Sequence, residues 1–366
     1  MVLSRRDVLK AGAAVSAIAA LPSWPARAGF APQTGKWRKF ELSTRLAIEN
    51  ASGVTQAWIP LPAFSEPSWI KPEGSSWSTN AKSAEIVKDP RYGAEFLHVV
   101  WNEGEKAPSI EVSSKVATQN RAVDLSRPLG TQTLSDTERH LYLMPTDLIP
   151  TDGIVKETSD KIVAGAKSDT DKAHAIYQWI VENCYRDAKT RGCGIGDIAN
   201  ILKSGNFGGK CADINALFVG LARAAGLPAR DLYGLRVAPS AFGYKSLGAK
   251  NDIVTKAQHC RAEVFLAEFG WVPMDPADVR KVMLEEPPGN LPLTDEKVAE
   301  ARKTLFGAWE GNWLAYNTAH DLALPGATGP KVGFLMYPEA EVAGERLDCL
   351  NADTFKYVIT ARELAV

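Results

Sequence analysis

The sequence predicts an α+β protein in which a buried helix packs on an antiparallel sheet, with a β-rich domain ahead of this core. Three observations lead to this prediction. Apolar and polar residues alternate in several segments before residue 135, which is typical of strands. The helix expected to begin at Cys211 is apolar on nearly every side, as buried helices are. Two strand-like segments separated by a turn then follow between residues 258 and 275.

The first 28 residues are a predicted export signal. Residues 4–10 resemble the twin-arginine motif of bacteria, with the paired arginines at Arg5 and Arg6. An apolar stretch over residues 11–21 follows, and residues 26–28 offer a small-residue cleavage site. The apolar stretch is too short to span a bilayer, and no other stretch is long and apolar enough. We therefore expect a periplasmic or otherwise exported bacterial protein, with the twin-arginine translocase as its partner during export and no membrane span in the mature chain.

The next hundred residues contain the strand-like segments. Residues 37–62, 85–100 and 109–116 alternate apolar and polar side chains and are separated by Pro, Gly and Ser. They predict a β-sandwich-like domain over residues 30 to about 130. Residues 131–158, rich in Pro, Asp and Thr, are expected to form a linker.

A glycine-rich turn leads into a helix at Cys211. The sequence around it is Gly-Asn-Phe-Gly-Gly-Lys-Cys-Ala-Asp-Ile-Asn, and Gly226 and Pro228 are expected to end the helix. A thiol at a helix N-terminus meets free backbone N–H groups and the positive end of the helix dipole, both of which favour the thiolate. The two glycines before it are expected to allow a tight turn and to leave room for a substrate carbonyl. Residues 229–238 alternate like a strand.

A histidine and a carboxylate follow in the order that thiol chemistry needs. His259 stands in Gln-His-Cys-Arg-Ala-Glu-Val-Phe, and Asp275 stands in Gly-Trp-Val-Pro-Met-Asp-Pro. His259 would hold the proton of the Cys211 thiol and return it to a leaving amine. Asp275 would orient the imidazole and stabilise its positive charge. The backbone N–H of Cys211 would donate to the oxyanion, and Tyr185, Asn206 and Gln258 are equal candidates for the second donor.

The spacing of the two residues predicts their relative position. His259 and Asp275 are separated by 16 residues, so a hairpin loop centred on Ala267 would place them directly across from each other on one face. Gly270 indicates a slightly later turn, which would require a bulge to restore that pairing. Along the first strand, His259 and Arg261 share one face, while Cys260 and its alternate neighbours share a core face.

Residues 160–280 resemble the transglutaminase-like superfamily, whose core is related to the papain-like thiol proteases. The resemblance rests on residues 173–184, on Gly-Gly-Lys-Cys-Ala-Asp, on Leu-Ala-Arg-Ala-Ala-Gly-Leu-Pro-Ala-Arg and on the segment from His259 to Gly-Trp-Val-Pro-Met-Asp-Pro. It implies a papain-like core in which a central helix packs on an antiparallel sheet, and a catalytic triad of Cys211, His259 and Asp275. Cys260 departs from the pattern, since relatives often carry a bulky residue beside the histidine.

The resemblance and the Pro-, Gly- and Ser-containing segments between the predicted elements together imply four regions. They are the signal peptide (1–28), the β-rich N-terminal domain (29–135), the catalytic core (136–290) and a C-terminal extension that packs on the core (291–366). A helix near residues 294–306 and a final strand over residues 354–361 are expected in the extension.

Four cysteines besides Cys211 leave several arrangements open. Cys184, Cys193, Cys260 and Cys349 allow three full pairings, and Cys184 and Cys193 flank a short segment that a disulfide could close. Twin-arginine substrates generally fold in the reducing cytoplasm, so folding is not expected to need a disulfide framework. A zinc site from Cys184, Cys193 and Cys260 lacks the paired-ligand spacing of such sites.

Composition excludes some partners. The chain has 42 basic and 43 acidic residues, a net charge of −1. Removing residues 1–28 takes away four basic residues and one acidic residue, which leaves a net charge of −4. This balance does not favour nucleic acid or an anionic membrane as a partner.

The sequence therefore predicts an exported thiol hydrolase that acts on amide bonds of peptide or cell-wall type through a Cys211 thioester. A protein-crosslinking transglutaminase shares the first half-reaction and differs in the group that attacks the thioester. A non-catalytic binding module of the same fold is the alternative from another class. No cofactor or metal is expected, and activity should survive chelation by EDTA.

Overall fold

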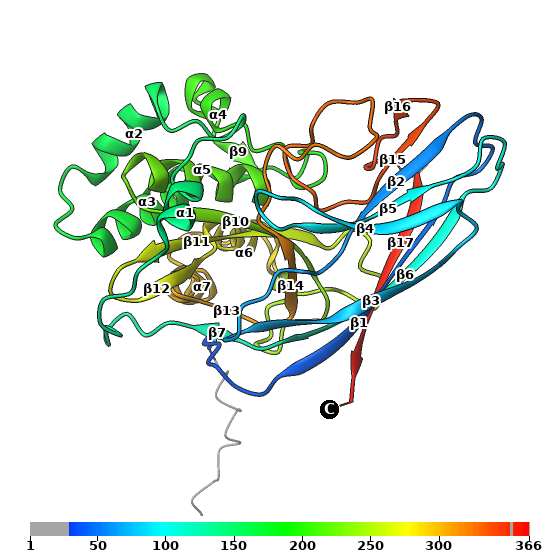
Figure 1. The fold of residues 1–366 in the computed structure, drawn as a ribbon. Helices are drawn as coiled ribbons and strands as arrows, with labels where there is room; N and C mark the ends of the chain where they lie inside the picture. The colour runs from blue at the N-terminus through cyan, green and yellow to red at the C-terminus, as the bar shows by residue number, and fades with distance from the viewer. Residues whose placement is uncertain (1–28, 352–353, 366) are drawn as a thin grey trace, which may run out of the picture.

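The computed structural model describes residues 29–351 and 354–365 of the 366-residue chain. The predicted export signal, residues 1–28, lies outside the described residues. Figure 1 shows two parts side by side: strands of the N-terminal region on one side, and helices gathered around a further sheet on the other. No helix in the described part of the chain has the length and apolarity that crossing a bilayer requires.

Two antiparallel sheets form the β-rich part of the molecule. Their orders are β17-β1-β6-β3 and β16-β15-β2-β5-β4. The two sheets enclose a shared apolar core to which Leu46, Ile59, Val99, Val112 and Ala340 contribute. The β-sandwich-like arrangement predicted from the alternating segments is therefore present. The strands are β1 Arg38–Ala47, β2 Thr55–Pro60, β3 Ile70–Thr79, β4 Ser83–Lys88, β5 Glu95–Val100, β6 Ser109–Thr118, β15 Glu339–Val342, β16 Glu345–Arg346 and β17 Lys356–Leu364.

The second part is a four-stranded antiparallel sheet covered by helices. Its order is β12-β11-β10-β14, with β10 Ala229–Arg236, β11 Gln258–Leu266, β12 Gly270–Met274 and β14 Trp313–Asn317. Short strand pairs join β7 Arg121–Ala122 to β13 Ala308–Trp309 and β8 Tyr185–Arg186 to β9 Gly208–Gly209. The helices are α1 Asp136–Leu141, α2 Gly153–Val163, α3 Asp169–Asn183, α4 Ile198–Ser204, α5 Cys211–Ala224, α6 Pro276–Glu285, α7 Glu296–Thr304 and the 3₁₀ helix η1 Lys245–Leu247.

Helix α5 is the centre of this part. All of its residues are buried, and helices α2, α3, α4 and α6 and strands β10 and β11 pack around it. In Figure 1 it lies between the outer helices and the sheet. Burial on every side explains why its sequence lacks the polar stripe of a surface helix. The helix ends where expected: Gly226 has a positive φ of 84° and Pro228 follows.

The C-terminal region is shared between the two parts. Strand β14 pairs with β10 in the helix-covered sheet, whereas β15 pairs with β2 and β17 pairs with β1 along its whole length. The final strand predicted from the sequence is thus present and returns to the first sheet. The domain boundaries drawn from the sequence stay a prediction. The expected linker over residues 131–158 contains α1 and the start of α2, because Ser135 caps a helix through the backbone N–H of Glu138.

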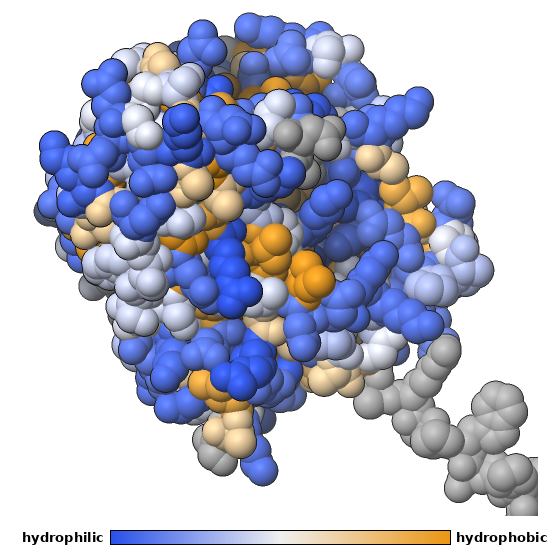
Figure 2. Space-filling view, turned by 90° about the vertical axis from the view of Figure 1, so that its right-hand side faces the viewer, coloured by the Kyte–Doolittle hydropathy of each residue, from blue (hydrophilic) through white to orange (hydrophobic). Residues whose placement is uncertain are grey.

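The surface of the β-rich side is mostly hydrophilic. Figure 2 shows this face with blue side chains over most of it and apolar side chains in small separate spots. Scattered apolar side chains of this kind are normal for a globular protein.

Gly234 is a position where the sheet depends on the absence of a side chain. It lies opposite His259 in β10, next to an irregularity in the pairing of β10 with β14. A Cβ there would lie 2.0 Å from the carbonyl oxygen of Leu314 and 2.5 Å from the ring of Trp313. That indole donates from Nε1 to the carbonyl oxygen of His259 at 2.9 Å. The indole of Trp313, which donates to the backbone of β11, thus fills the space above Gly234.

We predict that Gly234→Ala destabilises the protein by about 3 kcal/mol, since overpacking at a rigid backbone contact cannot be relieved by a side-chain movement. Thermal unfolding followed by circular dichroism measures the effect. Gly165→Ala is the matched control, because a Cβ at Gly165 meets nothing within 4 Å. Equal melting temperatures for the two variants would contradict the prediction.

Candidate active site

Cys211 is the first residue of α5, and its backbone N–H has no hydrogen-bond partner among the described residues. The turn before it is tight for a reason that the sequence did not reveal. A Cβ at Gly208 would lie 2.4 Å from the ring of Tyr185, and a Cβ at Gly209 would lie 2.6 Å from the Cβ of Asp213. The missing side chains at Gly208 and Gly209 therefore make room for Tyr185 and Asp213, and room for a substrate carbonyl stays a prediction.

Asp213 organises the entrance to the helix. Its Oδ1 accepts hydrogen bonds from the backbone N–H groups of Ile195 and Gly196, each at 2.9 Å. Its Oδ2 accepts from the backbone N–H of Lys210 at 3.0 Å. One carboxylate thus joins the loop that carries Cys193 to the first turn of α5.

His259 and Asp275 lie in direct contact. Nε2 of His259 is 2.8 Å from Oδ2 of Asp275, and both side chains are buried. The imidazole therefore donates from Nε2 to the carboxylate, which leaves Nδ1 for the thiol side. Asp275 is the N-cap of α6, and its Oδ1 accepts from the backbone N–H of Asp278 at 3.1 Å.

The route by which the two residues meet differs from the expected one. Strands β11 and β12 pair without a bulge, Leu266 opposite Gly270 and Ala262 opposite Met274, so the hairpin is centred one residue after Ala267. In this register Asp275 is not directly across from His259. It reaches the imidazole because the chain leaves β12 at Asp275 and turns into α6. The expected cross-strand pair and the expected bulge are both wrong, but the contact that they were meant to explain is present.

Further buried charges surround the pair. Oδ2 of Asp278 lies 3.4 Å from His259 Nε2, while its Oδ1 accepts from Arg236 at 2.5 Å. Nε of Arg261 lies 3.4 Å from Asp275 Oδ2. The guanidinium of Arg261 also packs over the rings of Trp309 and Trp313. Two arginines therefore balance the two carboxylates beside His259.

Asn215 completes the contacts of Asp275. Its Nδ2 donates to the carbonyl oxygen of Cys260 at 2.8 Å and to Asp275 Oδ1 at 3.3 Å. Arg236 and Arg261 were not predicted to belong to the site, although alternation along the strand places Arg261 on the face of His259. The shared strand face with His259 could have identified Arg261 as a site residue. No sequence signal identifies Arg236, because it comes from another strand.

The charges favour an ion pair between thiolate and imidazolium. Hydrogen bonds from the thiols of Cys193 and Cys260, together with His259, hold the pKa of the Cys211 thiol well below its usual range, against the effect of burial. Burial and Arg236 oppose protonation of His259, but Asp278 and Asp275 outweigh them and raise the pKa of its imidazole to about 9. Arg236 and His259 also outweigh burial at Asp278 and hold the pKa of that carboxyl well below its usual range.

The three candidates for a second oxyanion donor now differ. The hydroxyl of Tyr185 donates to Asn206 Oδ1 at 2.8 Å, and the same oxygen accepts from the backbone N–H of Gly208. Gln258, next to His259, has a buried Nε2 with no hydrogen-bond partner in the described chain. A buried unpaired donor is costly, and such a group often marks a ligand position. Gln258 is therefore the strongest of the three candidates.

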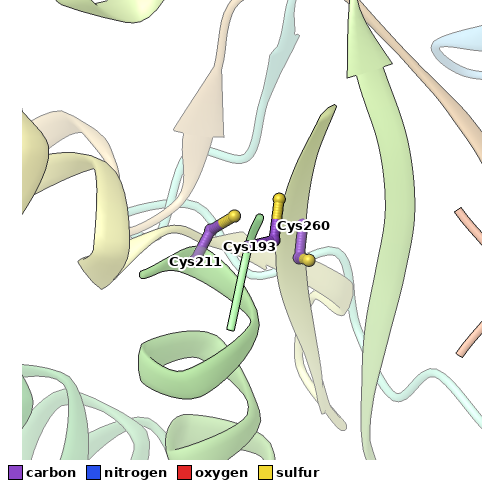
Figure 3. Close-up of side chains that lie close together, drawn as sticks. All are labelled: Cys193, Cys211 and Cys260. Carbon is purple, nitrogen blue, oxygen red and sulfur yellow. The ribbon is translucent and has the colours of Figure 1, made fainter. Parts of the chain in front are cut away.

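The five cysteines are free thiols, so the disulfide between Cys184 and Cys193 that the spacing allowed is not formed. Three of them gather at the start of α5: the Sγ atoms of Cys193, Cys211 and Cys260 all lie within 4.8 Å of one another. Figure 3 shows Cys211 at the first turn of the helix, Cys260 on the neighbouring strand and Cys193 drawn between them.

Two groups in the described chain have the donor atoms for a metal ion. One is this group of three thiols, and the other is His259 with Asp275 and Asp278. Structural zinc sites take four ligands, and the carboxylates of the second group are already engaged by Arg236 and Arg261. Cys184, a member of the zinc set considered from the sequence, does not belong to either group.

A pocket of about 680 Å³ lies away from these residues. It is lined by segments 29–34, 122–125, 303–304 and 306–308 together with Glu300. A smaller pocket of about 10 Å³ lies beside α5, where Ala212 and Ala216 face Tyr233, His320 and Phe334. The candidate site is therefore assigned from its chemistry and not from pocket size.

Comparison with known proteins places this chain in a family. Residues 156–276 match the model of the transglutaminase-like superfamily, and residues 2–22 match the signal sequence of the twin-arginine translocation pathway. An uncharacterized protein of Haemophilus influenzae is 37% identical over 332 residues, which cover 86% of this chain and 88% of that protein. The signal sequence marks the protein for export, as expected from Arg5 and Arg6.

Solved structures resemble the fold. The crystal structure of a "Putative Cysteine Protease" from Cytophaga hutchinsonii has a TM-score of 0.51 at 16% identity, covering 90% of this chain and 99% of that one. The periplasmic domain of TgpA from Pseudomonas aeruginosa has a TM-score of 0.33 at 16% identity, covering 66% of this chain and 88% of that domain. The first likeness supports the expected papain-like core, and the second is too distant to carry an argument.

The ion pair predicts a distinctive pH dependence of alkylation. The thiolate is the form that reacts with iodoacetamide, and a lowered pKa keeps Cys211 in that form at acidic pH. We expect the labelling rate of Cys211 to reach its plateau well below pH 8, whereas Cys184, whose pKa burial raises to about 12, stays unlabelled. Mass mapping of the labelled peptides at each pH gives both rates. A Cys211 profile centred at pH 8.5 would contradict the assigned ion pair.

Asp275 and Asp278 are distinguished by a pair of amide variants. Asp275→Asn keeps the cap of α6 but removes the charge that orients His259, so we expect kcat to fall by about 10²- to 10⁴-fold. The loss of stability should be smaller than in Asp278→Asn, because Arg261 lies 3.4 Å from Asp275, whereas Arg236 donates to Asp278 at 2.5 Å. Asp278→Asn instead leaves Arg236 buried without its partner, and we expect a loss of about 3 kcal/mol or more in stability. Rates on a peptide substrate and melting temperatures are measured for both. The reverse pattern would assign the orienting role to Asp278.

Proposed function

Because the chain belongs to the transglutaminase-like superfamily, we propose that it is an exported thiol hydrolase that cleaves amide bonds of peptide or cell-wall type. The proposal rests on one observation: Cys211 begins a buried helix beside a histidine whose other ring nitrogen is held by a carboxylate. Thiol, imidazole and carboxylate in this order are the parts of a nucleophile, an acid–base group and an orienting group.

The first half-reaction follows from these positions. The Cys211 thiolate attacks the carbonyl carbon of the amide, and the electron pair of the C=O bond moves to the oxygen. The free backbone N–H of Cys211 donates to that oxyanion, and Nε2 of Gln258 is the candidate for the second donor. The imidazolium of His259 then protonates the leaving amine from Nδ1, and a thioester with Cys211 remains.

The second half-reaction returns the enzyme to its starting state. Neutral His259 takes a proton from a water molecule as that water attacks the thioester, and the acid product leaves as the Cys211 thiolate re-forms. Asp275 keeps Nε2–H in place throughout, so that Nδ1 faces the reacting atoms in both steps. Arg236 opposes protonation of His259 and so limits how far the two carboxylates raise the pKa of its imidazole.

Burial of the nucleophile favours hydrolysis over crosslinking. Cys211 exposes only 4% of its surface and His259 only 3%. An extended peptide or a cell-wall-type amide reaches a buried thiol more readily than a side chain presented by a second folded protein. Water, as the smallest acceptor, also reaches the thioester most easily.

Cys211→Ser tests the proposal. Serine fills nearly the same volume, but its hydroxyl is far harder to deprotonate, so turnover should fall to background while the melting temperature changes little. Hydrolysis of a peptide and cell-wall amide library measures turnover, and Cys349→Ser serves as the control, since that thiol lies outside the site. Activity retained in Cys211→Ser would assign the nucleophile to another residue and overturn the proposed mechanism. No activity in the wild-type protein while substrates still bind would favour a binding module.

A further inference from the structure

The proposed mechanism uses one thiol, yet three lie together. Cys193 and Cys260 are not needed for the chemistry of Cys211, and all three thiols are nearly inaccessible, with exposed fractions of 6% for Cys193 and 0% for Cys260. Their Sγ atoms lie within 4.8 Å of that of Cys211 and of each other. Reactive thiols that meet an oxidant are protected when a second thiol stands close enough to form a disulfide.

The loop of Cys193 is held against the nucleophile by several contacts. The carbonyl oxygen of Cys193 accepts the backbone N–H of Ala212 at 2.9 Å. Just after Cys193, two backbone N–H groups donate to Asp213, as described above. Just before it, the carbonyl oxygen of Thr190 accepts from Lys210 Nζ at 2.7 Å. Hydrogen bonds to the backbone on both sides of Cys193 thus hold its loop beside Cys211.

Cys193 is better placed to approach Cys211 than Cys260 is. Cys260 lies within β11, opposite Tyr233 of β10, and its carbonyl oxygen accepts from Asn215. Its backbone is therefore fixed by the sheet. Cys193 lies outside the helices and strands, between Gly192 and Gly194, whose φ angles are 51° and 93°. A disulfide requires the two sulfurs at about 2.05 Å, and a rotation of the Cys193 side chain toward Cys211 disturbs no pairing of the sheet.

We propose that Cys193 is the resolving thiol of Cys211, so that peroxide converts the pair into a Cys193–Cys211 disulfide that a dithiol reductant reopens. In the first step the Cys211 thiolate attacks one peroxide oxygen and the O–O bond breaks. Sulfur is oxidised by two electrons to a sulfenic acid, and the other oxygen leaves as water after taking up a proton. In the second step the Cys193 sulfur attacks the Cys211 sulfur, the S–O bond breaks, and the thiol proton leaves with the hydroxyl group as a second water.

The electrostatics of the pair support this order of events. The hydrogen bond and the negative charge of Cys211 raise the pKa of Cys193, so Cys193 stays a thiol while Cys211 is a thiolate. Oxidation of Cys211 to a neutral sulfenic acid removes that charge. The Cys193 thiol therefore becomes easier to deprotonate at the step in which it attacks Cys211.

Export of the protein makes protection of Cys211 against irreversible oxidation useful. The twin-arginine signal marks the chain for export, and all five cysteines are free. Export delivers these thiols to a compartment in which disulfides form and persist. Closure of the pair would suspend the proposed hydrolase activity without irreversible loss of Cys211. The effect on turnover rests on the proposed function, but formation of the bond does not.

The test uses the reduced full-length mature protein treated with hydrogen peroxide, with dimedone as the trap for sulfenic acid. Non-reducing peptide mapping by mass spectrometry should find Cys193 linked to Cys211, and dithiothreitol should restore iodoacetamide labelling of Cys211. In Cys193→Ser we expect no such link, a dimedone adduct on Cys211 and progressive oxidation that dithiothreitol does not reverse. Each variant is compared with its own labelling before oxidation, and Cys184→Ser is the control that should behave like the wild type.

Three outcomes would overturn the proposal. They are a link of either thiol to Cys260, irreversible oxidation of Cys211 at equal rates in the wild type and in Cys193→Ser, and a metal ion bound stoichiometrically by the reduced thiols. The wild-type map decides the matter even if Cys193→Ser folds poorly. Because the readouts are masses and labelling, a disulfide found in a protein without amide hydrolysis would leave this proposal standing and overturn only the proposed function.

Discussion

The carboxylate of Asp275 is the contact on which the site depends. It accepts from the imidazole of His259 on strand β11, from the backbone N–H of Asp278 at the start of α6, and from Asn215 on α5. One buried group thereby sets the distances between the strand with the histidine, the helix that follows the hairpin and the helix with the nucleophile. Its charge can remain buried because hydrogen bonds and Arg261 compensate for lost hydration.

Charge balance extends this arrangement to the whole site. Arg236 pairs with Asp278, Arg261 lies beside Asp275, and His259 stands between the two carboxylates. A thiolate at the start of α5 adds a further negative charge, which the helix terminus and the imidazolium offset. The site therefore has no large net charge, although nearly every group in it is ionised and buried. Loss of any one charge alters the protonation of the others.

The C-terminal region contributes to the site indirectly. Strand β14 supports β10, and Trp313 on β14 donates to the backbone of His259. The chain then returns through β15 and β17 to the two sheets of the N-terminal region. The Cys193 loop meets this returning segment at Gly192, where a Cβ would lie 2.8 Å from Leu350 and 2.9 Å from the hydroxyl of Tyr337. The C-terminal region therefore covers the thiols, which explains their low exposure.

The sequence by itself determined the chemical types in the site and the elements that carry them. Three local patterns carried this information: the apolar helix after Cys211, the alternating strand of His259, and the glycines and prolines that end these elements. Local patterns specify helices and strands and their order along the chain. The family resemblance and the export signal are likewise written in contiguous residues, and both were confirmed. The roles of Cys211, His259 and Asp275 remain a proposal.

Tertiary structure alone decided which side chains meet. A shift of one residue in the centre of the hairpin moved Asp275 out of the predicted cross-strand position, and the turn into α6 brought it back to His259. Arg236 and Cys193 joined the site from a different strand and a distant loop. Contacts between residues far apart in the chain depend on packing and on hydrogen bonds such as those of Asp213, and no local pattern encodes them.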